Sequence, residues 1–250
     1  MITFGKSLTG MFVMNDSDIG VRHNNYTYKG TTQYWNGTDS KELFDQNCLN
    51  REKKELLQSL NWLDPDVISY KFNSFGFRDK EFDNRLCGLA LGCSHTEGTG
   101  IPNCSTWPRV LSKLTGVHLW NLGASGSSID TAFRLLDHWL PKLKPKFVVL
   151  CVPSMNRVEI FDSANPVSIM PNMSRRYLQD FYKVWAANEY NGQVLKRKNL
   201  LAMQQLCDQA DIPFRYLDHT TFRPDGHARD LMHYGVTAHY EFAQQMYNLL

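Results

Sequence analysis

The sequence predicts an α/β protein in which helices cover both faces of a mainly parallel sheet. From residue 86 onward, short apolar runs typical of buried strands alternate with helix-like segments, and glycine or proline marks many of the ends. Strands separated by helices imply parallel pairing through right-handed crossovers. We therefore expect a three-layer α/β/α sandwich over residues 86–250 and an irregular N-terminal extension, residues 1–85, that packs on it.

The expected elements follow one another in order. We expect strands at 86–91, 117–122, 147–152 and 213–217, and helices at 106–114, 129–140, 175–187, 194–209 and 236–249. Thr106 is a capping residue and Pro108 lies in the first turn of its helix, as is typical of helix starts. The helix over 129–140 has its apolar residues on one face, and Pro141 and Pro145 are expected to end it.

Residues 1–85 are different in character. The stretch up to Cys48 is rich in Asn, Thr, Tyr and Gly, and it has neither a helical nor a strand period. We expect loops and short strands, with one helix over 52–62 and a strand over 67–72. The aromatic, turn-rich stretch 73–78 is expected to pack on the main domain rather than to bind a ligand.

The composition is that of a globular chain with no strong charge. The 250 residues are 42% hydrophobic and 21% charged, and a formal net charge of +2 argues against nucleic acid as a partner. No apolar segment approaches the ~18 residues of a transmembrane segment. Residues 1–14 lack a standard signal peptide pattern, so we expect a cytoplasmic protein, or one otherwise without such a signal, and reduced cysteines.

Polar residues follow the predicted strands at one edge of the sheet. Ser94 ends a Gly-Cys-Ser run after the first strand, residues 121–128 follow the second, and Asn156 follows the third. Asp230 and His233 precede the closing helix. Because the carboxyl ends of parallel strands share an edge, we expect these groups to converge on one crevice, with Ser94 well placed to be a nucleophile.

The order of these blocks resembles the SGNH (GDSL-like) hydrolase superfamily. The blocks are Gly-x-Ser, Asn-x-Gly-x-x-Gly, an Asn after the next strand, and Asp-x-x-His near the carboxyl end. Trp107-Pro108 stands where that family often has Trp-Pro, and residues 73–82 are similar to members with an amino-terminal extension. The resemblance covers residues 92–242 and implies a flavodoxin-like sheet.

Carried over residue by residue, the resemblance implies a catalytic triad and an oxyanion hole. Ser94 would be the nucleophile, His233 its general base, and Asp230 the residue that orients the imidazole. The oxyanion would accept hydrogen bonds from the backbone N–H groups of Ser94 and Gly126 and from the side chain of Asn156.

Two positions depart from the family pattern. Cys93 replaces the aspartate of Gly-Asp-Ser, and Arg157 replaces the aspartate of Asn-Asp. Both lost carboxylates are supporting groups rather than triad members, so catalysis is not excluded. How firmly Ser94 and Asn156 are held depends on what fills that space.

The resemblance implies a serine hydrolase that cleaves carboxylic esters, of esterase, deacetylase or lipase type, with no cofactor and no metal. Its substrate would be a small-molecule, glycan or lipid ester, in a pocket with walls from residues 157–195. Two alternatives stay open: acyl transfer to a sugar acceptor, and a non-catalytic carbohydrate-binding or structural module that retains the fold. The sequence does not indicate the oligomeric state.

Other candidate residues carry weaker signals. His227 is the reserve candidate for the base, but only His233 has an aspartate three positions earlier. Cys93, His95 and Cys104 match no common zinc spacing.

The glycines of residues 121–126 do not form the dinucleotide pattern Gly-x-Gly-x-x-Gly, so a structural turn is favoured. A group of aromatic residues in the insert is expected to be helix core or a lid over the crevice, with a carbohydrate or acyl platform as the alternative. These residues are Phe181, Tyr182, Trp185 and Tyr190.

Overall fold

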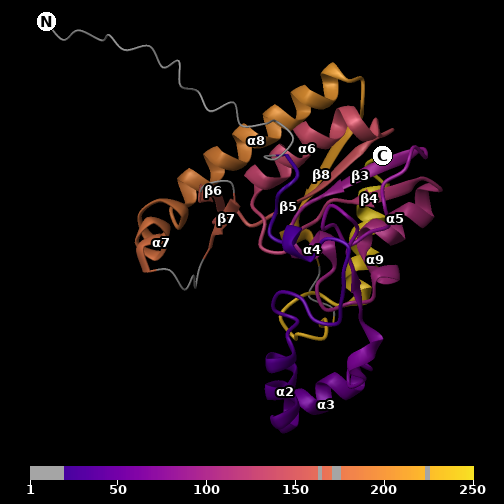
Figure 1. Cartoon of the computed structure of the whole chain (residues 1–250), viewed down its shortest axis with the longest axis vertical. Helices are drawn as coiled ribbons and strands as arrows, with labels where there is room; N and C mark the ends of the chain where they lie inside the picture. Colours follow the sequence, from indigo (N-terminus) through magenta and orange to yellow (C-terminus); the bar gives the residue numbers. More distant parts are fainter. Residues whose placement is uncertain (1–19, 163–164, 171–175, 223–225) are drawn as a thin grey trace, which may run out of the picture.

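The computed structural model describes residues 20–162, 165–170, 176–222 and 226–250 (Figure 1). The α-helices are α2 (Lys41–Leu49), α3 (Arg51–Ser59), α4 (Ser94–Glu97), α5 (Trp107–Thr115), α6 (Ile129–Leu143), α7 (Arg176–Phe181), α8 (Glu189–Gln209) and α9 (Val236–Tyr247). The strands are β1 (Thr32–Gln33), β2 (Tyr70–Lys71), β3 (Cys87–Leu91), β4 (His118–Asn121), β5 (Val148–Val152), β6 (Val158–Asp162), β7 (Asn165–Ile169) and β8 (Phe214–Asp218).

The central sheet has four parallel strands in the order β4-β3-β5-β8. Numbered along the chain, these four strands lie in the order 2-1-3-4, which is the flavodoxin-like arrangement with its switch point between β3 and β5. Leu89 in the middle of β3 lies opposite Trp120 of β4 and Val148 of β5. The predicted parallel sheet is therefore confirmed.

Two helical layers cover the sheet, one on each face. Leu89 of β3 and Val148 of β5 pack into the cluster that contains residues of α6 and α8. The neighbouring residues Ala90 and Val149 belong to the cluster formed with α5 and α9. Successive side chains of a strand point to opposite faces, so the two apolar strands supply both cores. This confirms the three-layer α/β/α sandwich.

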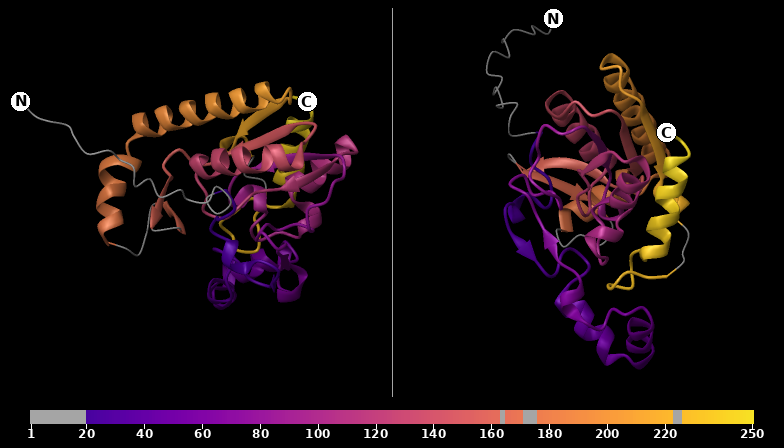
Figure 2. Two further views of the ribbon diagram at one scale, coloured as in Figure 1. Left: turned by 45° about the horizontal axis from the view of Figure 1, so that its top comes forward. Right: turned by 90° about the vertical axis from the view of Figure 1, so that its right-hand side faces the viewer.

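The N-terminal extension packs on the lower end of the sandwich through a third apolar cluster. Leu57, Ile68 and Tyr70 of the extension lie with Ile101 and Ala228 in this cluster, and all five side chains are fully buried. Helices α2 and α3 project away from the sheet as a pair (Figures 1 and 2). The division of the chain at residue 85 stays a prediction.

The extension differs from expectation in its local structure. Helix α2 was not anticipated; Ser40 begins it by accepting a hydrogen bond from the N–H of Leu43 (3.1 Å). The expected helix over 52–62 is α3, which ends at Ser59. The expected strand over 67–72 is confined to Tyr70–Lys71, because its antiparallel partner β1 has only two residues.

The insert after β5 also contains an element that was not anticipated. Strands β6 and β7 form an antiparallel hairpin, and Glu159 ties it to α6 by accepting hydrogen bonds from Thr131 (2.8 Å) and Arg134 (2.7 and 2.8 Å). Helix α7 continues into a π-helical turn over 182–186 before α8. Figure 2 shows α7 as a projection separate from the α2–α3 pair.

Two further features concern the core and its surroundings. Pro141 lies inside α6 instead of ending it, because Leu143 beyond it still packs on the core; the helix ends two residues before Pro145. The aromatic stretch 73–78 packs on the main domain as expected, with the ring centroids of Phe75 and Phe77 4.8 and 6.1 Å from that of Trp139. Within the described part of the chain, none of the helices has the length and apolar character to cross a membrane.

Candidate active site

Ser94 lies at the carboxyl end of β3, at the start of the four-residue helix α4. The chain turns there at Gly92, whose φ of +148° and close surroundings require glycine: a Cβ would lie 2.1 Å from Thr96 Oγ1 and 2.8 Å from the carbonyl oxygen of Cys151. Ser94 is the first residue of α4 and is 5% exposed. The sharp turn thus presents its hydroxyl at the sheet edge.

His233 meets Ser94 at this edge although the two residues are 139 positions apart. The Nε2 atom of His233 lies 2.8 Å from Ser94 Oγ. On the other side of the ring, Nδ1 lies 2.7 Å from Asp230 Oδ2. The structure therefore brings Ser94, His233 and Asp230 together in a continuous hydrogen-bonded row.

The Asp230 carboxylate is held by its own turn. Its Oδ1 atom accepts hydrogen bonds from the backbone N–H groups of Met232 (3.0 Å) and His233 (2.9 Å). Burial alone would raise the pKa of Asp230, but hydrogen bonds from His233 and Thr38 outweigh it, and the pKa is lowered to about 2. The residue is thus ionised at neutral pH. A carboxylate at Nδ1 favours the tautomer that leaves Nε2 free to accept the serine proton.

Thr38 contacts the hydrogen-bonded row of Ser94, His233 and Asp230, and sequence reasoning did not identify it. Its hydroxyl donates to Asp230 Oδ2 at 2.6 Å, from a turn in the N-terminal extension. No sequence motif marks a lone threonine so far from the blocks that it joins. Only the tertiary structure shows it.

The three oxyanion candidates each follow a different strand of the sheet. Ser94 follows β3 and, as the first residue of a helix, has an N–H group without an intrahelical partner. Gly126 follows β4, with a φ of +75°. Asn156 follows β5, and its amide oxygen accepts a hydrogen bond from the hydroxyl of Ser154. This hydrogen bond orients the amide, although the role of these three groups stays a prediction.

Glu97 is the last residue of the short helix that begins at Ser94. Its side chain is fully buried and accepts hydrogen bonds from Asn25 Nδ2 (2.8 Å), the backbone N–H of Ser125 (2.5 Å) and Asn36 Nδ2. Burial raises the pKa of Glu97, while these hydrogen bonds oppose that effect. Glu97 thus ties the Ser94 helix to the loop after β4 and to the N-terminal extension.

Cys93 and Arg157, the two residues that depart from the family pattern, lie in different environments. Cys93 is buried, and its Sγ lies 4.0 Å from Ser94 Oγ. Arg157 is partly buried, and its Nη1 atom has no hydrogen-bond partner among the described residues. Neither side chain reproduces the missing carboxylate.

The other histidines near the site serve the packing around His233. The ring of His95 lies 5.1 Å from that of His233 and 5.0 Å from that of Tyr234. Burial, followed by the charge of His233, lowers the pKa of His95 well below its usual value. The reserve candidate His227 is exposed, and its backbone carbonyl accepts a hydrogen bond from Trp62 Nε1 (2.9 Å).

The described side chains form no group suited to a metal ion. Over residues 20–162, 165–170, 176–222 and 226–250, there is no group of three or more His, Cys, Asp or Glu side chains suited to a metal ion. All six cysteines are free, and Cys104 is exposed whereas Cys93 is buried.

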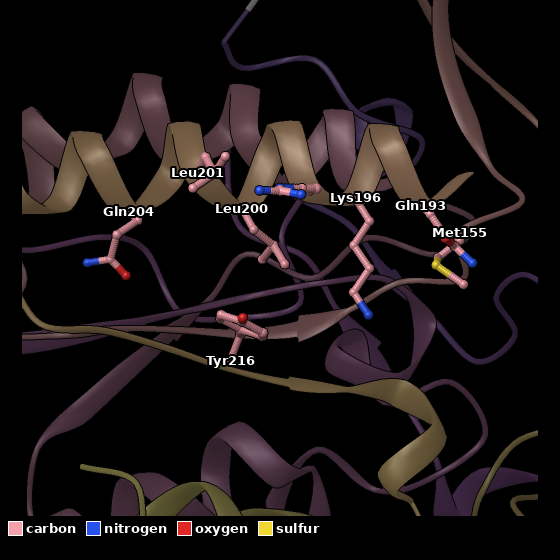
Figure 3. A pocket seen from close by; sticks show the side chains of 8 residues that line it. Met155, Gln193, Lys196, Leu200, Leu201, Gln204 and Tyr216 are labelled. Atoms are coloured by element: carbon pink, nitrogen blue, oxygen red, sulfur yellow. The ribbon is translucent and has the colours of Figure 1, made fainter. Parts of the chain in front are cut away.

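Two pockets lie along α8, and the wall of the first includes Asn156. The first has a volume of about 310 Å³ and is lined by the loops after β5 and β8 and by the start of α8, including Asn156, Asn188, Glu189, Gly192, Asp218 and His219. The second, of about 490 Å³, lies between α8 and β8, where Lys196 and Tyr216 point into it (Figure 3). Met155 lines both pockets.

The aromatic residues of the insert do not form one platform. Tyr182 and Trp185 pack against the core, and Phe181 stacks on Trp185 with ring centroids 5.8 Å apart. Tyr190 is 80% exposed. The insert contributes to the pocket beside Asn156 through residues around the start of α8. Whether this pocket binds the substrate stays a prediction.

No protein-family description and no curated protein matches the chain. Among solved structures, it is similar to a putative lipolytic protein of the G-D-S-L family from Desulfitobacterium hafniense, at 14% identity over 66% of this chain and 100% of that one, with a TM-score of 0.38. It is also similar to a psychrotrophic esterase from Pseudoalteromonas sp., at 16% identity over 66% and 74% of the two chains, with a TM-score of 0.34. A third is an acetyl xylan esterase from the rumen bacterium Butyrivibrio proteoclasticus, at 13% identity over 69% and 64%, with a TM-score of 0.35.

Proposed function

We propose that this chain is a serine hydrolase that cleaves carboxylic esters through an acyl-enzyme on Ser94. The observation that carries the proposal is the row of three side chains, with 2.8 Å between Ser94 Oγ and His233 Nε2 and 2.7 Å between His233 Nδ1 and Asp230 Oδ2. A serine hydroxyl is a weak nucleophile until an adjacent base removes its proton. These distances are those of a nucleophile, its base and the group that orients the base.

In the first half of the reaction, Ser94 Oγ attacks the ester carbonyl carbon while its proton passes to His233 Nε2. The negative charge of Asp230 stabilises the imidazolium that forms. The carbonyl oxygen becomes an oxyanion, for which the N–H groups of Ser94 and Gly126 and the amide of Asn156 are the candidate donors. When the tetrahedral intermediate collapses, the imidazolium gives its proton to the departing alcohol.

In the second half, water replaces the alcohol. His233 takes a proton from the water, whose oxygen attacks the acyl carbon. The second intermediate then collapses, the acid leaves, and the proton returns to Ser94 Oγ. The cycle consumes one ester and one water and yields one alcohol and one acid, with no metal or organic cofactor in any step.

The pocket of about 310 Å³ supports a polar alcohol as part of the substrate. Asn156 lies in its wall, so a molecule seated there is adjacent to one of the three candidate oxyanion donors. Its other side chains include the hydroxyls of Ser154 and Thr220 and the carboxylates of Glu189 and Asp218. Such groups can hydrogen-bond the hydroxyls of a small-molecule or glycan ester.

The state of the site argues against a non-catalytic module that merely retains the fold. Ser94 is 5% exposed and Asp230 is 2% exposed, and each keeps its hydrogen bond to His233. Buried polar side chains destabilise a fold unless hydrogen bonds satisfy them. A module without catalysis would have no use for these three side chains in this arrangement.

Turnover of a short-chain p-nitrophenyl ester tests the proposal. Ser94→Ala should lower kcat by about 10⁴-fold or more, because the covalent route is lost, while circular dichroism and the Tm stay close to those of the wild type. An unchanged rate in the folded variant would place the nucleophile elsewhere. A wild type that hydrolyses none of a panel of acyl esters would contradict ester hydrolysis itself.

A further inference from the structure

A tight turn in the N-terminal extension reaches into the row formed by Ser94, His233 and Asp230. Thr38, at the tip of this turn, donates its hydroxyl hydrogen to Asp230 Oδ2 at 2.6 Å. The same oxygen of Thr38 lies 3.3 Å from His233 Nδ1. The contact links residues 192 positions apart, so it is a product of the tertiary fold.

The turn is closed by its own backbone. The N–H of Asn36 donates to the carbonyl of Asp39 at 2.9 Å, and the N–H of Asp39 donates back to Asn36 at 3.1 Å. Gly37 has a φ of +61°, which permits the reversal between them. The position of Thr38 between these two hydrogen bonds is therefore restricted.

Both ends of the turn are anchored in buried polar groups. The Asn36 amide donates to the fully buried Glu97, which lies in the same short helix as Ser94. Asp39 accepts two hydrogen bonds from Arg229, the residue before Asp230. One turn thus spans from the nucleophile's helix to the triad aspartate.

We infer that Thr38 is a positioning residue that fixes the Asp230 carboxylate and, through it, the aim of the His233 imidazole at Ser94. Oδ1 of Asp230 is held by two backbone N–H groups, and Thr38 supplies the second hydrogen bond to Oδ2 beside that of His233. A carboxylate held at both oxygens cannot rotate away from the imidazole. This inference rests on the proposed hydrolase function and assigns the extension a part in it.

Thr38 and the His233 imidazole bind the same carboxylate oxygen of Asp230. Without the Thr38 hydroxyl, Oδ2 keeps only the hydrogen bond with His233 Nδ1 among the described contacts, so the carboxylate is held less firmly beside the imidazole.

The test compares Thr38→Val, which keeps the shape and removes the hydroxyl, with Thr38→Ser, which keeps the hydroxyl. For Thr38→Val we expect kcat on a p-nitrophenyl ester to fall about tenfold with little change in KM, the loss of one hydrogen bond to a charged group. Thr38→Ser should behave as the wild type. Thr38→Val should remain folded at the assay temperature, with a Tm lower by a few degrees at most, because it loses one hydrogen bond to a charged group.

A second measurement does not depend on turnover. The Nδ1 proton of His233 is observable by proton NMR at low field, and its chemical shift should change in Thr38→Val but not in Thr38→Ser. Equal kcat and equal Nδ1 shifts in the three proteins would overturn the role of Thr38. A wild type that hydrolyses no ester would instead count against the proposed function. The NMR comparison of the three proteins would still show whether Thr38 positions the Asp230–His233 pair.

Discussion

The carboxylate of Asp39 is bound at two points by the guanidinium of Arg229, with distances of 2.8 and 2.7 Å. Both side chains are at most 1% exposed, and the hydroxyl of Tyr70 donates to the same carboxylate at 2.6 Å. Arg229 directly precedes Asp230, so this buried pair joins the N-terminal extension to the segment that carries the hydrogen-bond partner of His233.

Asp39→Asn should therefore be strongly destabilising. It leaves the Arg229 guanidinium buried without its counter-charge, and breaking such a pair costs about 3–5 kcal/mol. Urea unfolding at pH 7 measures the change. The matched control is Asp45→Asn, which breaks the exposed Lys41–Asp45 pair and should leave the midpoint almost unchanged. Equal midpoints for Asp39→Asn and the control would contradict an anchoring role for the pair.

Mild acid, between pH 7 and pH 5, should lower the free energy of unfolding because one histidine is buried in its neutral form. His239 is 1% exposed, and burial lowers its pKa to about 3 in the folded protein. The unfolded chain, with an ordinary histidine pKa near 6.5, binds more protons between those two values, so stability falls as the pH drops through this range. From pH 7 to pH 5, this histidine alone should remove about 2 kcal/mol.

His239→Asn isolates that contribution. The Oδ1 atom of asparagine, bonded to Cγ as Nδ1 is in histidine, can still accept the hydrogen bond from the N–H of Trp107 (3.2 Å), but the side chain does not titrate. The loss of unfolding free energy between pH 7 and pH 5 should be smaller in the variant by about 2 kcal/mol. The same pH dependence in both proteins would show that His239 is not held neutral by burial.

Asn156 should be needed for its amide hydrogens rather than for its shape. Removing one oxyanion donor costs about 10²–10³-fold in kcat. Asn156→Ala should show such a loss, and Asn156→Asp, which keeps the shape but has no N–H donor, should lose at least as much. Steady-state kinetics and the Tm of both variants give the result. Wild-type kcat in Asn156→Asp would exclude Asn156 as an oxyanion donor.

The parallel sheet could be predicted from the sequence because its strands are buried on both faces. The apolar run ending at Leu91 and the run over 147–152 have no polar alternation, and short runs of that kind are typical of parallel strands. The convergence of Ser94, Asp230 and His233 was predicted from two arguments: parallel strands place their carboxyl ends at one edge, and the order of the motifs resembles that of the SGNH hydrolases.

The remainder depends on contacts that local patterns do not encode. Helix α2 carries only a few apolar residues, so its amphipathic signal is weak, although Ser40 does cap it. The Thr38 contact with Asp230 and the buried Glu97 network join segments that are distant in sequence. Such polar contacts have no period, and a single sequence therefore gives no signal for them.

Covalent labelling with a fluorophosphonate tests most directly whether Ser94 is an activated nucleophile. The reagent phosphonylates a serine hydroxyl whose proton a neighbouring base can take, so the reaction requires Ser94 and His233 to act together. The account predicts stoichiometric labelling of the wild type, a single modified peptide that contains Ser94, and no labelling of Ser94→Ala. A folded wild-type protein that stays unlabelled, or carries the label on another residue, would contradict it.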